Sequence, residues 1–512
     1  MAQPVVEIGT GKVQGITDDG VHLFKGIPYG APTGGKNRFL PPQAAKPWAG
    51  IKETTTFGAA CWQASEGNVR MGYWGANGVD AMSEDCLLLN VWTKGLNDNR
   101  KRPVMVWIHG GGYRTGSANQ APFYDGTMLA KTYDVVVVSI NHRLNVFGYL
   151  HLADILGEQY ASSGNNGMLD IVQALKWVRD NISIFGGNPG NVLIFGESGG
   201  GAKVSTLLGM PSAKGLFHRA VIQSGPSLRA QTREDATRNA KEFLDVARIT
   251  PARVNQLHDN RADNIFYAYM AMVRNANRPN AELGPVCDGK IIPVQPFDPV
   301  AAPTAADVPV IVGCNRDETA FMLMRDPMFG QFDEKTMRQR VIGTLAQRTG
   351  DKGLEEKADK LIAGYRKTRP GSTPHDILVA VGSDRMRIAS VRLAERKTAA
   401  GKPAYMYLFT WESLVWRGRL KSAHSFEIPF VFNYMHDPTV TFLGDNPGRF
   451  KLAETMSSAW TTFANSGDPN HKGMINWPVY DAAKRATMIF NYECKIENDP
   501  FAEERKLWDG II

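Results

Sequence analysis

Short apolar runs alternate with longer helical patterns along most of the chain, and this alternation constrains the fold more than any other feature. The clearest runs, rich in Val and Ile, cover residues 104–108, 135–140, 192–195 and 308–312. Such nearly continuous runs are typical of strands buried on both faces of a mostly parallel sheet. Between two of them, residues 168–178 repeat apolar side chains at helical spacing. The order strand, helix, strand, helix predicts an α/β fold in which helices flank a large central sheet.

The segments outside this alternation predict two other kinds of structure. Residues 5–16 and 21–29 are punctuated by glycines and indicate antiparallel hairpins near the N-terminus. Residues around 230–285 and 325–400 are polar and helical in pattern, which indicates helical insertions with a cap or regulatory role. No repeat, low-complexity tract or charged linker marks a domain boundary, although 512 residues would accommodate several domains of roughly 150 residues.

The composition excludes several classes of protein. Hydrophobic residues make up 43% and charged residues 21% of the chain, which excludes disordered and fibrous proteins. The net charge of +7 is spread along the chain, so we expect no nucleic-acid partner, which would require basic residues on one face. No apolar stretch reaches the ~18 residues that cross a bilayer, so we expect no membrane span. The first residues also lack the basic and apolar regions of a signal peptide.

The strongest signal for chemistry is a serine between glycines. The apolar run 192–195 leads into Gly196, Ser198 and Gly199-Gly200, and residues 202–208 continue as a helical pattern. A G-x-S-x-G motif alone is weak, but a strand before it and a helix after it are typical of a nucleophile elbow. The glycines leave room for a tight, strained turn. The alternative interpretation is a glycine-rich turn with an incidental serine.

A second glycine cluster follows the run 104–108. His109 is followed by Gly110-Gly111-Gly112, and such an HGGG-type loop upstream of the nucleophile is expected to donate backbone N–H groups to an oxyanion. A phosphate loop is disfavoured because no G-K-[ST] follows. His109 itself is interpreted as structural, because it lies on the donor loop.

These motifs, with several others in the same order, resemble the type-B carboxylesterases, the cholinesterase-like branch of the α/β-hydrolases. The further matching segments are S-E-D-C-L-L-L-N at 83–90, F-K-G-I-P-Y-G at 24–30, and residues 141–148, 167–188 and 477–491. The resemblance covers nearly the whole chain. It implies one α/β-hydrolase domain over residues 1–512, serine esterase activity on small-molecule esters, and no metal or organic cofactor.

The acid and the base of a triad are expected after Ser198, because α/β-hydrolases carry them in that order. Glu318 follows the run 308–312 in an N-x-D-E segment similar to the family's, with Asp317 as its rival. His424 begins a block, H-S-F-E-I-P-F-V-F, that resembles the family's histidine block, and it is favoured over His436. The expected triad is therefore Ser198, Glu318 and His424.

The resemblance also implies roles for neighbouring residues. Gly111, Gly112 and Gly199 would supply the oxyanion N–H groups, and Gly199 stands where the family usually has Ala. Ser224 is expected to contact the acid. Glu197, beside the nucleophile, is expected to contact the catalytic residues without touching the substrate.

Several cations near the predicted base suggest a preference among substrates. They either form a solvated loop or favour an anionic ester, such as an ester of a polycarboxylic acid. The cations preceding the base are Arg417, Arg419 and Lys421. The candidate substrate-binding residues are Tyr113, Trp416, Arg417 and Arg229.

Other functions use the same sequence features. An amide or carbamate hydrolase would need the same triad. A non-catalytic adhesion protein of the family would lack the nucleophile, whereas this chain has Ser198, Glu318 and His424. A lipase is disfavoured because the sequence has no clear amphipathic lid; residues 63–85 are the only candidate. The oligomeric state is left open.

Five cysteines stand at positions 61, 86, 287, 314 and 494, none in a CxxC zinc spacing. Cys61 and Cys86 resemble the family's N-terminal disulfide, which would stabilise the fold by roughly 3 kcal/mol. That bridge would indicate an oxidising compartment and hence a secreted or periplasmic protein. The alternative is a pair of reduced thiols in the cytoplasm. Cys287 and Cys314 are a second possible pair.

Overall fold

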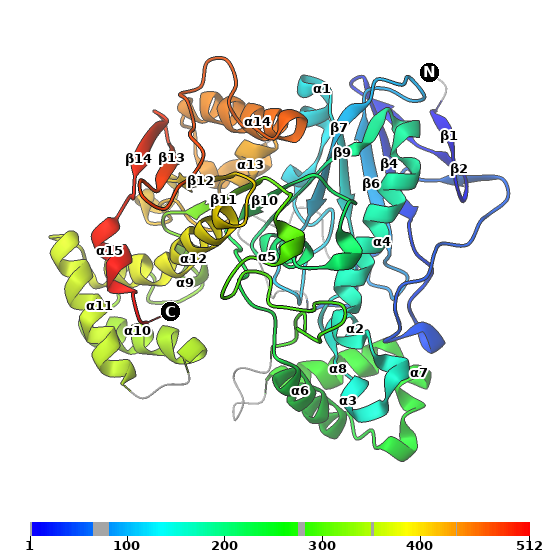
Figure 1. Cartoon of the computed structure of the whole chain (residues 1–512), viewed down its shortest axis with the longest axis horizontal. Coiled ribbons are helices and arrows are strands. Elements are labelled where there is room, and N and C mark those ends of the chain that lie inside the picture. Colours follow the sequence, from blue (N-terminus) through cyan, green and yellow to red (C-terminus); the bar gives the residue numbers. More distant parts are fainter. Residues whose placement is uncertain (1–2, 65–80, 275–281, 350–352, 437, 512) are drawn as a thin grey trace.

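An 11-stranded sheet forms the centre of the computed structural model, which describes residues 3–64, 81–274, 282–349, 353–436 and 438–511 (Figure 1). The strand order is β14-β13-β12-β11-β10-β9-β7-β8-β6-β4-β3. The strands of this sheet are β3 (Ile16–Asp18), β4 (Val21–Pro28), β6 (Leu88–Thr93), β7 (Arg102–Ile108), β8 (Val136–Ile140), β9 (Gly187–Glu197), β10 (Arg219–Gln223), β11 (Val310–Asn315), β12 (Ala404–Phe409), β13 (Ala486–Phe490) and β14 (Lys495–Asn498). A small second sheet contains β1 (Val5–Ile8), β2 (Gly11–Gln14) and β5 (Ile51–Glu53).

The middle of the large sheet is parallel and its edges are antiparallel. From β8 through β7, β9, β10, β11 and β12 to β13, every neighbouring pair is parallel. The antiparallel strands are β6, β4 and β3 at one edge and β14 at the other. The predicted mostly parallel sheet with antiparallel N-terminal strands is therefore confirmed.

Each central strand contributes to two cores, because successive side chains point to opposite faces. In β7, Val104 and Val106 belong to one hydrophobic cluster, whereas Met105 and Trp107 belong to the other. Helices cover both faces of the sheet (Figure 1). They are α1 (Thr127–Tyr133), α2 (Asn145–Tyr149), α3 (Ala153–Leu156), α4 (Asn166–Asn181), α5 (Gly199–Leu208), α6 (Arg233–Val246), α7 (Gln256–Asp259), α8 (Ala262–Val273), α9 (Thr319–Leu323), α10 (Glu334–Thr349), α11 (Leu354–Thr368), α12 (Pro374–Ala399), α13 (Ile428–Val431), α14 (Gly448–Ser466) and α15 (Ala502–Leu507).

Both segments predicted to be helical insertions contain helices. The first carries α6, α7 and α8, and the second carries α10, α11 and α12. The long helix α12 begins with a capping box, in which Thr373 accepts from the backbone N–H of Asp376 and the Asp376 side chain accepts from the backbone of Thr373. In Figure 1, α10 and α11 lie at the lower left of the view, and α6, α7 and α8 lie at its bottom.

The expected disulfide between Cys61 and Cys86 is absent, and this prediction was wrong. All five cysteines are free thiols. Cys61 and Cys86 are both buried and hydrogen-bond to each other, and Cys61 Sγ also accepts from the backbone N–H of Leu144 at 3.3 Å. The thiols are satisfied as hydrogen-bonding groups, so the pair gives no support to an oxidising compartment. Cys287 and Cys314 are likewise unbonded.

Within the described residues, no helix combines the length and the apolar character that crossing a bilayer requires.

Candidate active site

Ser198 occupies the sharp turn between β9 and α5. Its backbone has φ 57° and ψ −122°, a strained conformation for a residue with a side chain. The turn is held by a hydrogen bond from the Ser198 N–H to the Gln223 carbonyl oxygen at 2.9 Å. A Cβ at Gly196 would lie 2.6 Å from the Ile108 carbonyl oxygen, so only glycine fits there. This is the strand–turn–helix context that the sequence motif required.

Glu318 and His424 meet in a buried hydrogen bond although 106 positions separate them. Glu318 follows β11, and its Oε1 accepts from the backbone N–H of Asn315 at 2.7 Å. Its other oxygen accepts a short hydrogen bond from His424 Nδ1. His424 lies in the loop between β12 and α13 and is 3% exposed. A carboxylate that binds Nδ1 fixes the tautomer of the ring and leaves Nε2 free for a proton.

Two further carboxylates lie beside this pair. His424 Nε2 is 3.2 Å from Glu197 Oε1, and Ser425 Oγ donates to the same oxygen at 2.7 Å. Glu427 is fully buried and accepts from the Asn315 side chain at 2.7 Å. The imidazole is therefore enclosed by acidic groups that are themselves hydrogen-bonded.

The burial of these groups shifts their proton affinities. Burial raises the pKa of Glu197 to about 8 and, with the charge of Glu318, the pKa of Glu427 to about 7. Burial by itself would lower the pKa of His424, but the charges of Glu197 and Glu318 and the hydrogen bond with Glu318 outweigh it and raise this pKa. The cluster thus favours the imidazolium, the form that appears when a histidine accepts a proton from a nucleophile.

The rival candidates for acid and base are engaged elsewhere. Asp317 pairs with Arg316 at 2.8 Å and accepts from the backbone N–H of Ser422 at 3.3 Å. The His436 ring stacks against Phe450, with 4.9 Å between centroids. The structure therefore brings together Glu318 and His424 from among the predicted candidates.

The loop that follows β7 lies directly against the first turn of α5. Gly111 and Gly112 have φ values of +83° and +65°. A Cβ at Gly199 would lie 2.3 Å from the backbone nitrogen of Gly112, so this nitrogen and the start of α5 are immediate neighbours. His109 is buried and stacks on His142, with 4.6 Å between ring centroids. Its placement agrees with the structural role expected for it.

The expected contact between Ser224 and the acid is absent. In the described part of the chain, the buried Ser224 hydroxyl has no hydrogen-bond partner. Its backbone takes φ 49° and its N–H donates to the Gly313 carbonyl oxygen at 2.8 Å, a contact that fixes the end of β10. Ser224 thus helps to fix the end of β10 through its backbone N–H. The group that binds the Glu318 carboxylate is instead the backbone N–H of Asn315.

The candidate substrate-binding residues fall into two groups. Tyr113 packs inward against Tyr149, with 5.1 Å between ring centroids, and Arg229 is paired with Asp298. Trp416, on the 3₁₀ turn η9 (Val415–Gly418), is 41% exposed, and its neighbour Arg417 is exposed as well. Arg229, Trp416 and Arg417 are thus exposed, whereas Tyr113 is half-buried.

The cations that precede His424 differ in their partners. Lys421 forms an ion pair with Asp376 at 2.5 Å. Arg417 and Arg419 are exposed and form no ion pair with any residue that the structure describes. Of the candidate lid, residues 63–85, positions 65–80 lie outside the described residues.

Sequence reasoning missed Asn315, Ser425 and Glu427 as members of this cluster. Glu427 stands in the histidine block, at the acidic position of that pattern, which was the signal available. Asn315 and Ser425 gave no signal, because their roles depend on which side chains the folded loops bring together.

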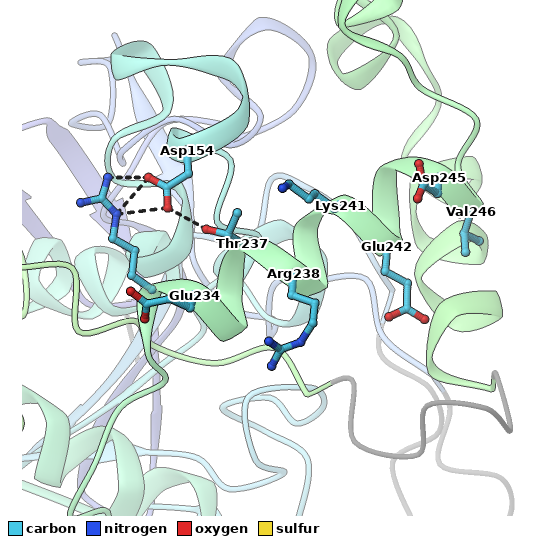
Figure 2. A pocket seen from close by; sticks show the side chains of 9 residues that line it. Asp154, Glu234, Thr237, Arg238, Lys241, Glu242, Asp245 and Val246 are labelled. Carbon is cyan, nitrogen blue, oxygen red and sulfur yellow. Dashed lines mark hydrogen bonds and ion pairs between the residues drawn. The ribbon is translucent and has the colours of Figure 1, made fainter.

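A surface hollow of about 910 Å³ lies beside α6 and includes none of these residues (Figure 2). Asp154 on its wall pairs with Arg233 and accepts from Thr237 Oγ1 at 2.6 Å. Both cations and carboxylates of α6 line the rest of the hollow, so its charges are of mixed sign. Among the described residues, no cluster of His, Cys, Asp and Glu has the arrangement of a metal site.

Comparison with known proteins identifies the family. The model of the carboxylesterase family matches residues 2–508 of the chain. The chain belongs to the carboxylesterase family. This carboxylesterase is 35% identical to the para-nitrobenzyl esterase of Bacillus subtilis (strain 168) over 509 residues, which cover 99% of this chain and 98% of the relative. It is 34% identical to the liver carboxylesterase of Sus scrofa over 511 residues, which cover 93% and 88%.

Solved structures give the same result for the fold. A crystal structure of a Geobacillus stearothermophilus carboxylesterase is similar with a TM-score of 0.84 and 37% identity, and the match covers 98% of this chain and 99% of that chain. The α/β-hydrolase fold is confirmed, as is the resemblance to the type-B carboxylesterases. This carboxylesterase is a carboxylic ester hydrolase.

Proposed function

We propose that this carboxylesterase hydrolyses esters through an acyl group on Ser198, with His424 as general base and Glu318 as the residue that orients it. The observation that supports this most is the buried hydrogen bond between Glu318 and His424 Nδ1. It leaves Nε2 beside Glu197, the residue next to Ser198 in the chain. A nucleophile, a base and an orienting acid in this order form the general arrangement of covalent acyl transfer.

The proposed reaction has two halves. Ser198 attacks the ester carbonyl while His424 accepts its proton, and the N–H groups of Gly111, Gly112 and Gly199 stabilise the oxyanion. His424 then gives the proton to the departing alcohol, and a water molecule cleaves the acyl-serine by the same route. In the described chain the Ser198 hydroxyl has no hydrogen-bond partner; contacts of this kind often tighten only when substrate binds.

An organophosphate titration tests this proposal. Diethyl p-nitrophenyl phosphate is expected to release one p-nitrophenol per chain and to abolish ester hydrolysis, because an activated serine forms a stable phosphoryl ester. Mass spectrometry of the digested protein should locate the added group on the peptide that contains Ser198. Full activity after complete labelling, or a label on another peptide, would contradict the proposal.

The same residues would suit an amide or carbamate hydrolase. Esters are proposed as the main substrates because the family and the relatives are esterases. Rates for an ester, a carbamate and an anilide that share one acyl group would rank the three classes.

We further propose that Arg417 and Arg419 favour anionic esters, because both are exposed and unpaired in the described chain and stand in the segment that immediately precedes His424. Replacing both by glutamine is expected to lower the ratio of kcat/KM for a succinate monoester to that for a neutral ester of equal length by about three- to tenfold. Salt should lower the wild-type ratio in the same way. Arg229→Gln is the control, since this arginine is paired with Asp298 and lies outside the segment that precedes His424. A wild-type ratio of anionic to neutral kcat/KM that is near one and insensitive to salt would contradict this proposal.

A further inference from the structure

A fully buried lysine lies one helical turn beyond the proposed nucleophile. Lys203 is on α5, four residues after Gly199, so both residues are on the same face of the helix. Lysines are almost never fully buried unless they are paired with a charge. Lys203 has no ion pair with any residue in the described part of the chain. Its burial therefore calls for another explanation.

The Lys203 ammonium binds the loop that is proposed to hold the oxyanion. Its Nζ donates to the carbonyl oxygen of His109 at 3.0 Å and lies 5.7 Å from the centre of the Tyr113 ring. The stacked rings of His109 and His142 are its titratable neighbours, and burial together with the Lys203 charge lowers the pKa of both. Burial also lowers the pKa of Lys203, to about 7.

The same face of α5 meets this loop at two more points. A Cβ at Gly199 would lie 2.3 Å from the nitrogen of Gly112, and a Cβ at Gly200 would lie 2.0 Å from the carbonyl oxygen of Ile108. Helix α5 thus contacts the loop at three points: the carbonyl oxygens of Ile108 and His109 and the backbone nitrogen of Gly112. Glycine loops rotate their peptide planes readily, because glycine allows both signs of φ. A hydrogen bond to the His109 carbonyl oxygen opposes such rotation at the start of the loop.

We propose that Lys203 is a positioning residue that holds the His109 carbonyl group and thereby directs the N–H groups of Gly111 and Gly112 toward the oxyanion. This role rests on the proposed function of Ser198 and its oxyanion loop. Lys203 does not touch the ester; it acts through the backbone of the loop. Loss of one oxyanion donor lowers kcat by about 10²–10³, and a loop that is displaced only part of the time should cost less.

Lys203→Met tests the proposal, because methionine fills the space of the lysine stem without a donor. With active sites counted by organophosphate titration, kcat is expected to fall by about 10- to 100-fold while KM changes little. The affinity for a trifluoromethyl ketone, which forms an oxyanion on the serine, should fall in proportion to kcat/KM. Lys203→Gln keeps an N–H donor and should retain most of the activity.

Lys397 supplies a matched control. It is also fully buried, and its Nζ donates to the carbonyl oxygens of Ala306 and Lys402 at 3.0 and 3.1 Å. Lys397→Met is therefore expected to lower stability without lowering kcat per active site. Should the Lys203→Met variant not fold, Lys203→Leu, which also lacks a donor, carries the same expectation.

Two results would overturn the proposal. One is a Lys203 variant with wild-type kcat and wild-type affinity for the ketone. The other is an equal loss of kcat in the Lys203 and Lys397 variants, which would indicate a general effect of losing a buried lysine. Failure of the proposed function itself would look different, since hydrolysis would then survive phosphorylation of the Ser198 peptide.

Discussion

Replacing Ser198 by alanine is expected to lower kcat for ester hydrolysis by ~10⁴–10⁶, with little change in the thermal unfolding temperature. The variant loses the nucleophile but keeps the oxyanion loop, so a residual rate above that of water should remain. The measurement is the hydrolysis of a p-nitrophenyl ester at high enzyme concentration, compared with the rate without enzyme. Substrate binding should be retained, because the Ser198→Ala change removes only a single hydroxyl group.

Ser205→Ala is the matched control for this change. Ser205 lies on α5, the helix that follows Ser198, and is fully buried; its hydroxyl donates to the Gly201 carbonyl oxygen at 3.0 Å. Its loss should leave kcat near the wild-type value. Hydrolysis by Ser198→Ala at the wild-type rate would show that another residue forms the acyl intermediate.

Replacing Glu318 by glutamine is expected to lower kcat by ~10³–10⁴. The glutamine amide would donate to His424 Nδ1 and so favour the tautomer that carries its proton on Nε2, which cannot accept a proton from Ser198. Removal of the charge also lowers the pKa of His424, because the Glu318 charge helps to raise it. The acid limb of the kcat/KM profile, which reports protonation of the base, should therefore move to lower pH.

Asp317→Asn separates the two candidate acids. Asp317 is paired with Arg316 and bound by the Ser422 backbone, so its replacement should lower the unfolding temperature and leave kcat per active site largely unchanged. If Asp317→Asn lost more activity than Glu318→Gln, the role of the acid would pass to Asp317.

The sequence was sufficient for the features that local pattern controls. The apolar runs predicted the strands of the parallel sheet, and G-x-S-x-G after a strand predicted the turn at Ser198. Glu318 and His424 were found because each stands in a segment that resembles the family's. Their meeting, by contrast, depends on the pairing of β11 with β12, which no local pattern specifies.

The failures concern contacts that depend on the final packing. Cys61 and Cys86 lie close together, but their spacing in the sequence does not distinguish a bond from two thiols that hydrogen-bond. Ser224 follows the expected strand, yet a positive φ and a backbone contact with Gly313 keep its hydroxyl from the acid. Lys203 had the pattern of an ordinary helical residue, and only the close approach of the glycine loop to α5 gives it a partner.

The strand order has a consequence for how this enzyme loses activity. The proposed nucleophile, oxyanion loop, acid and base follow β9, β7, β11 and β12, which with β10 form five consecutive strands of one sheet. Neighbouring strands are spaced at roughly 4.8 Å, so the separation of the catalytic groups is fixed by hydrogen bonds between strands. Fraying of the edge strands β3 and β14 leaves this geometry intact. Heat should inactivate the enzyme only when the middle of the sheet itself opens, in one cooperative step.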